Sequence, residues 1–151
     1  MEVQYLKIHI NEDSNLRETE ITINCNKISA EVEKMISLLR VLDLKLTGKK
    51  DNQTYILDAS KVLYIDTVDK KTFFYTKKDI YETELKLYEL EEQLAAMDFI
   101  RSNKSCILNF NQIISIRADI DGKLLVTMSN NENLFVSRQY APIIKKKLGV
   151  K

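Results

Sequence analysis

The sequence FIRSNKSCILNFN, residues 99–111, holds the features around which the rest of the chain can be interpreted. Its first half is basic and rich in amides, and residues 106–108 form an apolar run that predicts a strand. A second apolar run further along the chain ends in VSRQ, residues 136–139. Small polar side chains and isolated cations at strand ends indicate a surface that binds an anionic partner, because a core would exclude them.

The composition is that of a folded globular protein. The chain has 151 residues, of which 44% are apolar and 30% are charged, enough for one or two small domains with an ordinary core. No run of about eighteen apolar residues is present, so no membrane span is expected. The N-terminus is acidic and alternating, unlike a signal peptide, and a cytoplasmic location is therefore expected.

Charge and cysteine content limit the classes of function further. Residues 1–45 carry a net charge of −2 and residues 46–151 one of +3, a slight surplus that points towards nucleic acid. Cys25 and Cys106 lie far apart and His9 is the only histidine, so neither a metal site nor a disulfide framework is predicted. Both cysteines are expected to be small buried hydrophobic residues.

The sequence offers no catalytic arrangement. With one histidine on the outer face of a predicted strand, a Ser-His-Asp or Cys-His arrangement lacks its base. Gly48, Gly122 and Gly149 are isolated turn residues and do not form a phosphate-binding loop. We therefore expect no enzyme, no cofactor and no small-molecule substrate.

Residues 1–44 are predicted to form a ββα segment. Apolar residues alternate in residues 1–10 and again in residues 18–25, which predicts a hairpin with a long loop. From Ile28 to Leu42, apolar residues recur every three or four positions, which predicts a helix. This helix either packs on the hairpin or pairs in part with a second copy of the chain.

Residues 45–151 are predicted to form a mostly antiparallel β-domain with short helices, so the fold class is α+β. Polar turns separate short apolar runs, and Asp121-Gly122 is the strongest hairpin signal because type I′ turns need positive φ. Helical spacing of apolar residues predicts a helix over residues 87–97. Pro142 opens a second helix that ends before Gly149. The two parts of the chain are expected to share an interface.

Three polar turns at strand ends are candidate binding loops. Cations neutralise phosphates, and Asn, Gln and Arg can form paired hydrogen bonds with base edges. A single turn of this kind is more often only a solvated turn. With three of them in one small β-domain, binding to a partner and simple solvation become equally good interpretations. The turns contain Lys70, Lys71 and Thr72; Arg101, Asn103, Lys104 and Ser105; and Arg138 and Gln139.

Five motifs follow one another in a characteristic order. They are ILD at 56–58, VLYID at 62–66, LYELEEQL at 87–94, FIRSNKSCILN at 99–109 and VSRQY at 136–140. In this order and spacing they resemble the LytTR family of bacterial DNA-binding domains, over roughly residues 45–150. The resemblance implies an elongated, mostly antiparallel β fold whose loops enter successive major grooves of double-stranded DNA.

The same resemblance assigns DNA contacts to the three turns. The first contact position holds Lys70, Lys71 and Thr72, the second holds Asn103 and Lys104, and the third holds Arg138. This sequence departs from those members that carry a histidine in the first turn, so Thr72 or the two lysines must serve there instead. Contact of the two lysines with the DNA backbone is expected.

The resemblance also suggests partners. Residues 1–44 are too short for a receiver domain, so the chain is similar to short stand-alone LytTR regulators. Paired LytTR domains bind direct repeats, which implies promoter repeats and a homodimer. Such regulators are often encoded beside small membrane proteins that restrain them, so residues 1–44 are expected to dimerise the protein or to dock such an antagonist. The alternative is a protein-interaction module with little DNA binding of its own.

Overall fold

The computed structural model describes residues 6–42 and 44–149. The α-helices of the described residues are α1 (Ala30–Leu42), α2 (Leu87–Leu94) and α3 (Ala141–Lys147), and short 3-10 turns are η1 (Ala59–Lys61), η2 (Ala95–Met97), η3 (Phe110–Gln112) and η4 (Ile120–Gly122). The strands are β1 (Lys45–Lys50), β2 (Gln53–Asp58), β3 (Tyr64–Val68), β4 (Lys71–Tyr75), β5 (Ile80–Thr83), β6 (Phe99–Asn103), β7 (Cys106–Asn109), β8 (Ile113–Ala118), β9 (Leu124–Met128) and β10 (Asn133–Val136). The prediction of an α+β fold dominated by short strands is confirmed.

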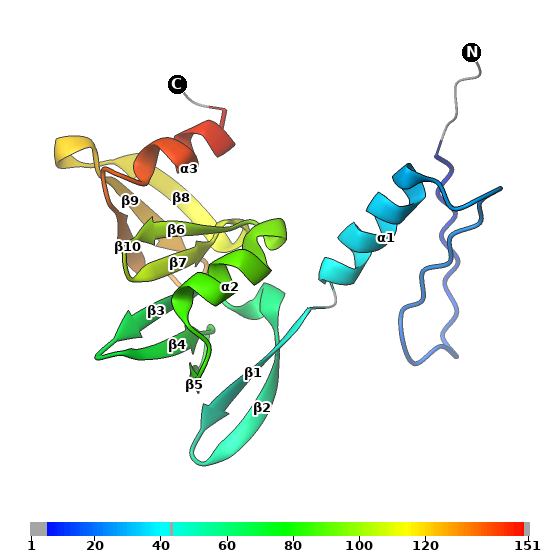
Figure 1. The fold of residues 1–151 in the computed structure, drawn as a ribbon, viewed down its shortest axis with the longest axis horizontal. Helices are drawn as coiled ribbons and strands as arrows, with labels where there is room; N and C mark the ends of the chain where they lie inside the picture. Colours follow the sequence, from blue (N-terminus) through cyan, green and yellow to red (C-terminus); the bar gives the residue numbers. More distant parts are fainter. Residues whose placement is uncertain (1–5, 43, 150–151) are drawn as a thin grey trace.

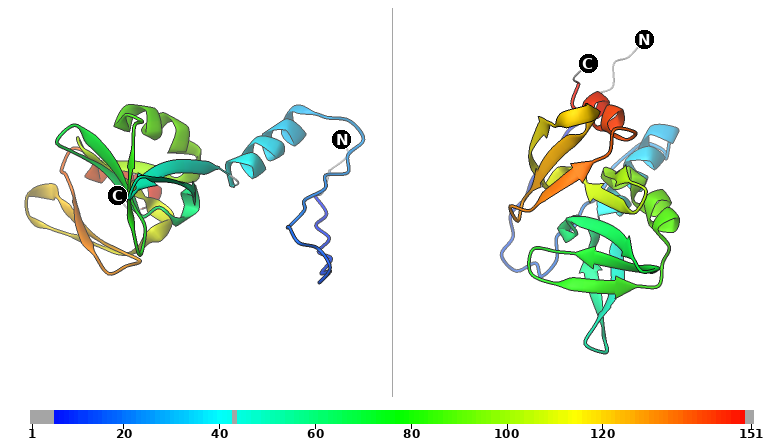
Figure 2. Two further views of the ribbon diagram at one scale, coloured as in Figure 1. Left: turned by 90° about the horizontal axis from the view of Figure 1, so that it is seen from below. Right: turned by 90° about the vertical axis from the view of Figure 1, so that its left-hand side faces the viewer.

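The strands form two antiparallel sheets. The larger sheet has the order β2-β1-β5-β4-β3-β7-β6, and the smaller one has the order β10-β9-β8. Figure 1 shows the β1–β2 hairpin projecting at one end of this domain and the smaller sheet with α3 at the other, so the domain is elongated. Figure 2 shows the same arrangement from two further sides.

Side chains of β3 and β7 alternate between two cores, because successive residues of a strand point to opposite faces. Ile65 and Ile107 belong to one core, with Leu90 of helix α2. Tyr64 and Leu108 belong to the other, with the smaller sheet and helix α3. Since both faces are covered, residues 62–65 and 106–108 form continuous apolar runs, as is typical of buried strands.

Tight turns close the hairpins of the larger sheet. Asp51 and Asn52 between β1 and β2 have φ of 51° and 64°, and Asp69 and Lys70 between β3 and β4 have φ of 51° and 67°. Two successive positive φ values define the type I′ turn, whose twist matches that of the flanking strands. The predicted Asp121-Gly122 hairpin also forms, although its connection between β8 and β9 is longer than two residues.

One strand was not expected from the sequence. The sequence predicts a polar turn that includes Arg101 and Asn103, whereas residues 99–103 form the edge strand β6, which pairs with β7. Phe99 and Ser102 are buried on this strand, so one side of the strand faces inward although the segment contains several polar residues. The loop itself is reduced to Lys104 and Ser105.

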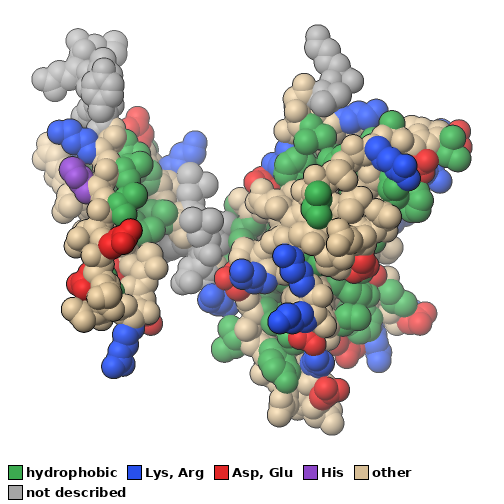
Figure 3. All heavy atoms as spheres, turned by 180° about the vertical axis from the view of Figure 1, so that it is seen from behind, with side chains coloured by type: hydrophobic (Ala, Val, Ile, Leu, Met, Phe, Trp, Pro, Cys, Tyr) green, Lys and Arg blue, Asp and Glu red, His purple; other side chains and the backbone are tan. Residues whose placement is uncertain are grey.

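The predicted N-terminal hairpin is not formed in the described residues. Residues 6–29 contain no strand, and the alternating Leu6, Ile8 and Ile10 are 70%, 76% and 88% exposed. Figure 3 shows hydrophobic side chains along this separate body. An isolated two-stranded hairpin is only marginally stable in water, and within the described residues no second layer covers the apolar face that the predicted hairpin would have. Residues 1–5, which belong to the predicted first strand, lie outside the described residues.

The predicted N-terminal helix is present as α1. It begins at Ala30 and not at Ile28, because Ser29 caps it: the Ser29 hydroxyl accepts a hydrogen bond from the backbone N–H of Val32 at 3.3 Å. Helix α1 contacts η2 of the domain, so the two parts of the chain share an interface there. Figure 1 shows the rest of α1 extending away from the domain.

The two cysteines differ. Cys106 is buried on β7 as predicted, and burial raises the pKa of its thiol to about 11. Cys25 is exposed, so the prediction that it is buried was wrong: its segment lacks the covering layer described above. None of the helices in the described part of the chain is long and apolar enough to cross a membrane.

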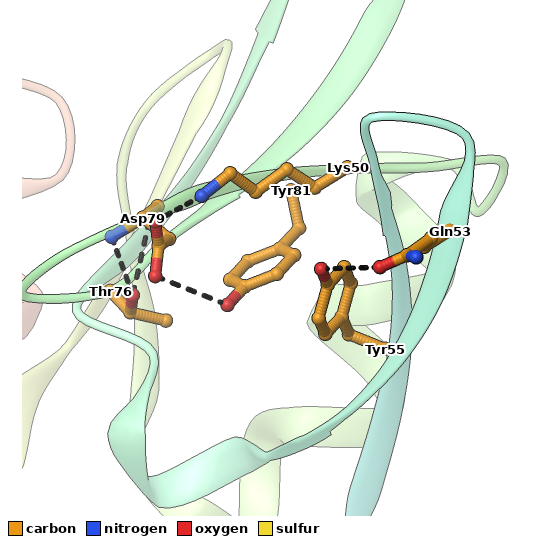
Figure 4. Close-up of polar contacts among 6 residues, drawn as sticks. All are labelled: Lys50, Gln53, Tyr55, Thr76, Asp79 and Tyr81. Atoms are coloured by element: carbon orange, nitrogen blue, oxygen red, sulfur yellow. Dashed lines mark hydrogen bonds and ion pairs between the residues drawn. The ribbon is translucent and has the colours of Figure 1, made fainter.

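A polar cluster fastens the β1–β2 hairpin to the rest of the sheet (Figure 4). Lys50 on β1 forms an ion pair with Asp79, the residue immediately before β5. The backbone N–H of Asp79 donates to the Thr76 hydroxyl at 3.1 Å, and the Tyr81 hydroxyl lies 3.5 Å from the second carboxylate oxygen. These contacts lie at the opposite end of β4 from the β3–β4 turn.

Candidate nucleic-acid interface

The first candidate loop is the β3–β4 turn. Lys70 is exposed at its tip, and the Lys71 ammonium lies 3.8 Å from the Glu82 carboxylate on β5. Thr72 is only 5% exposed, and its hydroxyl lies 3.4 Å from that of Thr67 across the hairpin. The tip therefore presents lysine to solvent, whereas Thr72 belongs to the interior of the sheet.

The second loop is the β6–β7 turn, and its own side chains hold its shape. The Asn103 side-chain oxygen accepts hydrogen bonds from the Ser105 backbone N–H at 2.8 Å and from the Ser105 hydroxyl at 3.0 Å. This is an Asx turn, in which a side chain mimics the backbone. The Asn103 amide nitrogen and the exposed Lys104 ammonium make no hydrogen bond to another described residue.

Arg101 anchors this loop from behind. Its Nε forms an ion pair with the Glu91 carboxylate of α2, and one terminal nitrogen donates to the Lys104 carbonyl at 2.6 Å. Its side chain is 17% exposed. Arg101 therefore connects helix α2 to the loop and has its charge already neutralised.

The third loop follows β10 and leads into α3. The Tyr140 backbone N–H donates to the Ser137 carbonyl at 3.0 Å, which forms a turn. Arg138 and Gln139 are exposed on this turn, and the Arg138 guanidinium forms no ion pair with a described residue. The Ser137 hydroxyl is buried and has no partner within the described part of the chain.

Two backbone hydrogen bonds bring the three loops together. The Thr67 N–H at the end of β3 donates to the Ser105 carbonyl at 2.9 Å, and the Ser137 N–H donates to the Ser102 carbonyl at 2.8 Å. The β6–β7 turn therefore lies between the other two. Figure 1 shows the three strand ends on the left-hand side of the domain, and the right-hand view of Figure 2 faces that side.

Buried and partly buried polar groups support the strands behind the loops. The rings of Tyr64 and Tyr75 stack with centroids 4.2 Å apart, and the Tyr64 hydroxyl donates to Glu132 at 3.0 Å. Burial, reinforced by the neighbouring Asp66, raises the pKa of Tyr75 to about 12. Burial also raises the pKa of Asp66, and the Tyr75 hydroxyl opposes that rise. Both phenols therefore remain hydrogen-bond donors at neutral pH.

The arrangement gives one surface with three free cations. Lys70, Lys104 and Arg138 come from segments far apart in the sequence, and none is paired with another described residue. Such a surface can neutralise phosphates along a duplex, and its arginine can form paired hydrogen bonds with a guanine edge. Sequence reasoning missed the residues that connect the loops, because Thr67 and Ser102 act through backbone atoms, which leave no side-chain signal.

A comparison with protein families agrees with this geometry. The family model of the LytTr DNA-binding domain matches residues 52–149. The chain belongs to the LytTR family. A solved LytTr DNA-binding domain from Bacillus cereus matches it with a TM-score of 0.66 and 33% sequence identity, covering 70% of this chain and 96% of that domain. LytTR domains bind DNA and are not enzymes.

Curated relatives extend the similarity to the N-terminal part. A Staphylococcus aureus protein (strain NCTC 8325) is 28% identical over 147 residues, which are 96% of this chain and 99% of the relative. Another, from strain MSSA476, is 30% identical over 140 residues, 90% of this chain and 95% of the relative. Both are named HTH-type transcriptional regulators. In the matched LytTR domain strands separate α2 from α3, so its described residues contain no helix-turn-helix.

Proposed function

We propose that the protein is a sequence-specific transcriptional regulator that reads successive major grooves of promoter DNA through the three loops. The observation that carries the proposal is the hydrogen-bonded row of three turns, each with an unpaired cation. The relatives named as transcriptional regulators support the same role.

Each loop receives a role from its contacts. Arg138 reads a base, and the Asn103 amide nitrogen with the Lys104 ammonium makes the second contact. Lys70 and Lys71 bind phosphates, and the exposed Gln139 lies beside Arg138. We assign no direct DNA contact to Thr72, Arg101 or Ser105, because their side chains are buried or hydrogen-bonded within the protein.

The central test is Arg138→Ala on a promoter fragment that the parent protein selects from genomic DNA. Loss of a paired hydrogen bond should weaken specific binding by about 1–3 kcal/mol and relax the preference at one base pair. The matched control is Lys77→Ala, which removes an exposed cation at the opposite end of β4. Equal binding by the parent and Arg138→Ala in a gel shift would reject the role of Arg138.

The phosphate contacts are tested by salt. Each phosphate neutralised contributes about −0.9 to the slope of log affinity against log salt concentration. Lys70→Ala should therefore reduce the magnitude of the slope by roughly one unit without changing the preferred sequence. If the variant keeps the full slope, Lys70 does not contact the backbone.

For residues 1–44 we propose a role in pairing two chains on direct repeats. The support is the row of exposed apolar residues that includes Leu6, Ile8, Ile10 and Ile21, since apolar patches of this kind mark association surfaces. Replacing Ile8 and Ile21 by Asn should make sedimenting dimers dissociate. Ile56→Asn on β2, where the side chain is 75% exposed, is the control.

A second candidate function rests on the same apolar row. The protein could be an interaction module that docks a partner, such as a small membrane-protein antagonist, and binds little DNA itself. Absence of binding to any genomic fragment at low salt would favour this candidate, because phosphate contacts are strongest there. Steep salt-dependent binding would reject it.

A further inference from the structure

We propose that Gly122 is a positioning residue for Arg138. Gly122 lies in the connection between β8 and β9, sixteen positions before Arg138 in the sequence. The space that a side chain would fill there is occupied by the aliphatic stem of the arginine. The inference rests on the proposed DNA contact of Arg138 and adds to it the residue that fixes the arginine.

The distances describe a close fit. A Cβ atom on Gly122 would lie 3.0 Å from Arg138 Cγ, 3.2 Å from Cδ and 3.9 Å from Cβ. Ordinary contact between carbon atoms is about 3.5–4.0 Å. Three carbons of the stem therefore lie directly over the glycine, and even a methyl group would be too close to two of them.

The arginine, and not the loop, should give way to an added side chain. The loop is closed by a hydrogen bond from the Asp119 N–H to the Lys123 carbonyl at 2.8 Å and by another from the Lys123 N–H to the Ile120 carbonyl at 3.3 Å. Arg138 is exposed and its guanidinium has no ion pair with a described residue. Its long, rotatable stem is thus the part that can move most easily.

A displaced Arg138 stem would weaken DNA binding. A side chain held in its bound direction loses less conformational entropy on binding than one that is free to rotate. The bare surface of Gly122 provides such a support at the base of the guanidinium. Displacing the stem should therefore weaken the same contact that Arg138→Ala removes, and no other.

The chain contains a matched control for backbone strain. Gly149 has the same φ of 76° as Gly122, and a Cβ there would meet nothing within 4 Å. Alanine is strained at either position because positive φ disfavours residues with a Cβ. Gly149→Ala therefore reproduces the strain of Gly122→Ala without touching Arg138.

The experiment is a double-mutant cycle in the full-length protein, on the fragment that the parent selects from genomic DNA. Contacting residues typically couple strongly, so Gly122→Ala should weaken binding about two- to tenfold in the parent. The same change should have almost no effect in Arg138→Ala, and Gly149→Ala should bind like the parent. Base preference should relax at the base pair that Arg138→Ala affects.

Several outcomes would overturn the inference. They are an equal loss of affinity from Gly122→Ala with and without Arg138, the same loss from Gly149→Ala, or no loss from Gly122→Ala. If Arg138→Ala itself binds like the parent, the proposed contact fails first and the role of Gly122 fails with it. Should Gly122→Ala not fold, Gly122→Asn adds the same Cβ on a residue that tolerates positive φ.

Discussion

The N-terminal part and the LytTR domain both contain apolar patterns that predict strands, and these patterns end in different structures. Leu6, Ile8 and Ile10 alternate with polar residues and remain exposed without a strand. Ile65 and Ile107 lie on strands with neighbours on both edges and are fully buried. Alternation defines a face, but a strand becomes stable only when another strand and a second layer cover it.

The largest expected effect tests this contrast directly. Leu108 is fully buried between the two sheets, so Leu108→Ala should lower the free energy of unfolding by about 2–5 kcal/mol. Ile8→Ala removes a side chain that is exposed in the single chain, and should change it by less than about 0.5 kcal/mol at a protein concentration low enough for the chain to be monomeric. Urea unfolding of both variants and the parent at that one low concentration provides the comparison.

A large loss in Ile8→Ala would break the contrast. It would mean that the N-terminal apolar row is covered in solution, as the proposed pairing of two chains requires. Repeating the measurement over a range of protein concentrations separates the explanations, because stability gained from association rises with concentration. A loss that is independent of concentration would place the cover within one chain.

Local sequence signals predicted the elements that depend on nearby residues. The turn between β3 and β4, the helix α2 and the helix α3 follow from turn chemistry and spacing within a few residues. The N-terminal hairpin and the strand β6 were misjudged, because their outcome depends on a distant partner. Strand β6 has that partner in β7, whereas residues 6–10 have none among the described residues.

The same limit applies to the candidate interface. The positions of Lys70, Lys104 and Arg138 on exposed turns could be predicted from strand-end composition. The burial of Thr72 and the engagement of Arg101 could not, because they are set by neighbouring elements whose placement the pattern does not give. Charge alone did not distinguish the arginine that anchors a loop from the arginine that is free.

An intermediate effect is expected for two residues of the β6–β7 hairpin, Arg101, which anchors its turn, and Lys104, which is proposed to bind DNA. Arg101→Ala removes the ion pair with Glu91 and a hydrogen bond to the Lys104 carbonyl, and should lower the free energy of unfolding by roughly 1–3 kcal/mol. Lys104→Ala removes an unpaired exposed cation and should leave stability unchanged while weakening DNA binding. Chemical unfolding and a gel shift on the same preparations measure both.

The opposite pattern would reverse these assignments. If Arg101→Ala keeps the stability of the parent and loses DNA binding, the guanidinium leaves Glu91 to reach the DNA. Glu91→Ala is the control, because it removes the ion pair and keeps the arginine. Loss of stability in both Arg101→Ala and Glu91→Ala would support the anchoring role.

The smallest expected effect compares two carboxylates of the domain, that of Asp66 on the covered strand β3 and that of Asp79 at the open β4–β5 turn. Burial raises the pKa of Asp66, so its ionised form opposes folding, and this cost disappears as the pH falls through the raised pKa. The hydrogen bond from Lys50 lowers the pKa of Asp79, so Asp79 stabilises the fold above its unfolded pKa and loses that effect on acidification.

The two asparagine variants should therefore have opposite signs at pH 7. Asp66→Asn should raise the melting temperature and Asp79→Asn should lower it, and both differences should shrink as the pH falls below about 4, where carboxyl groups become protonated. Calorimetry at several pH values measures the trend. A lower melting temperature for Asp66→Asn at pH 7 would mean that the hydrogen bond from the Tyr75 hydroxyl outweighs the cost of burying the Asp66 carboxylate. An ionised carboxylate would then stabilise the fold in both the covered and the open parts of the sheet.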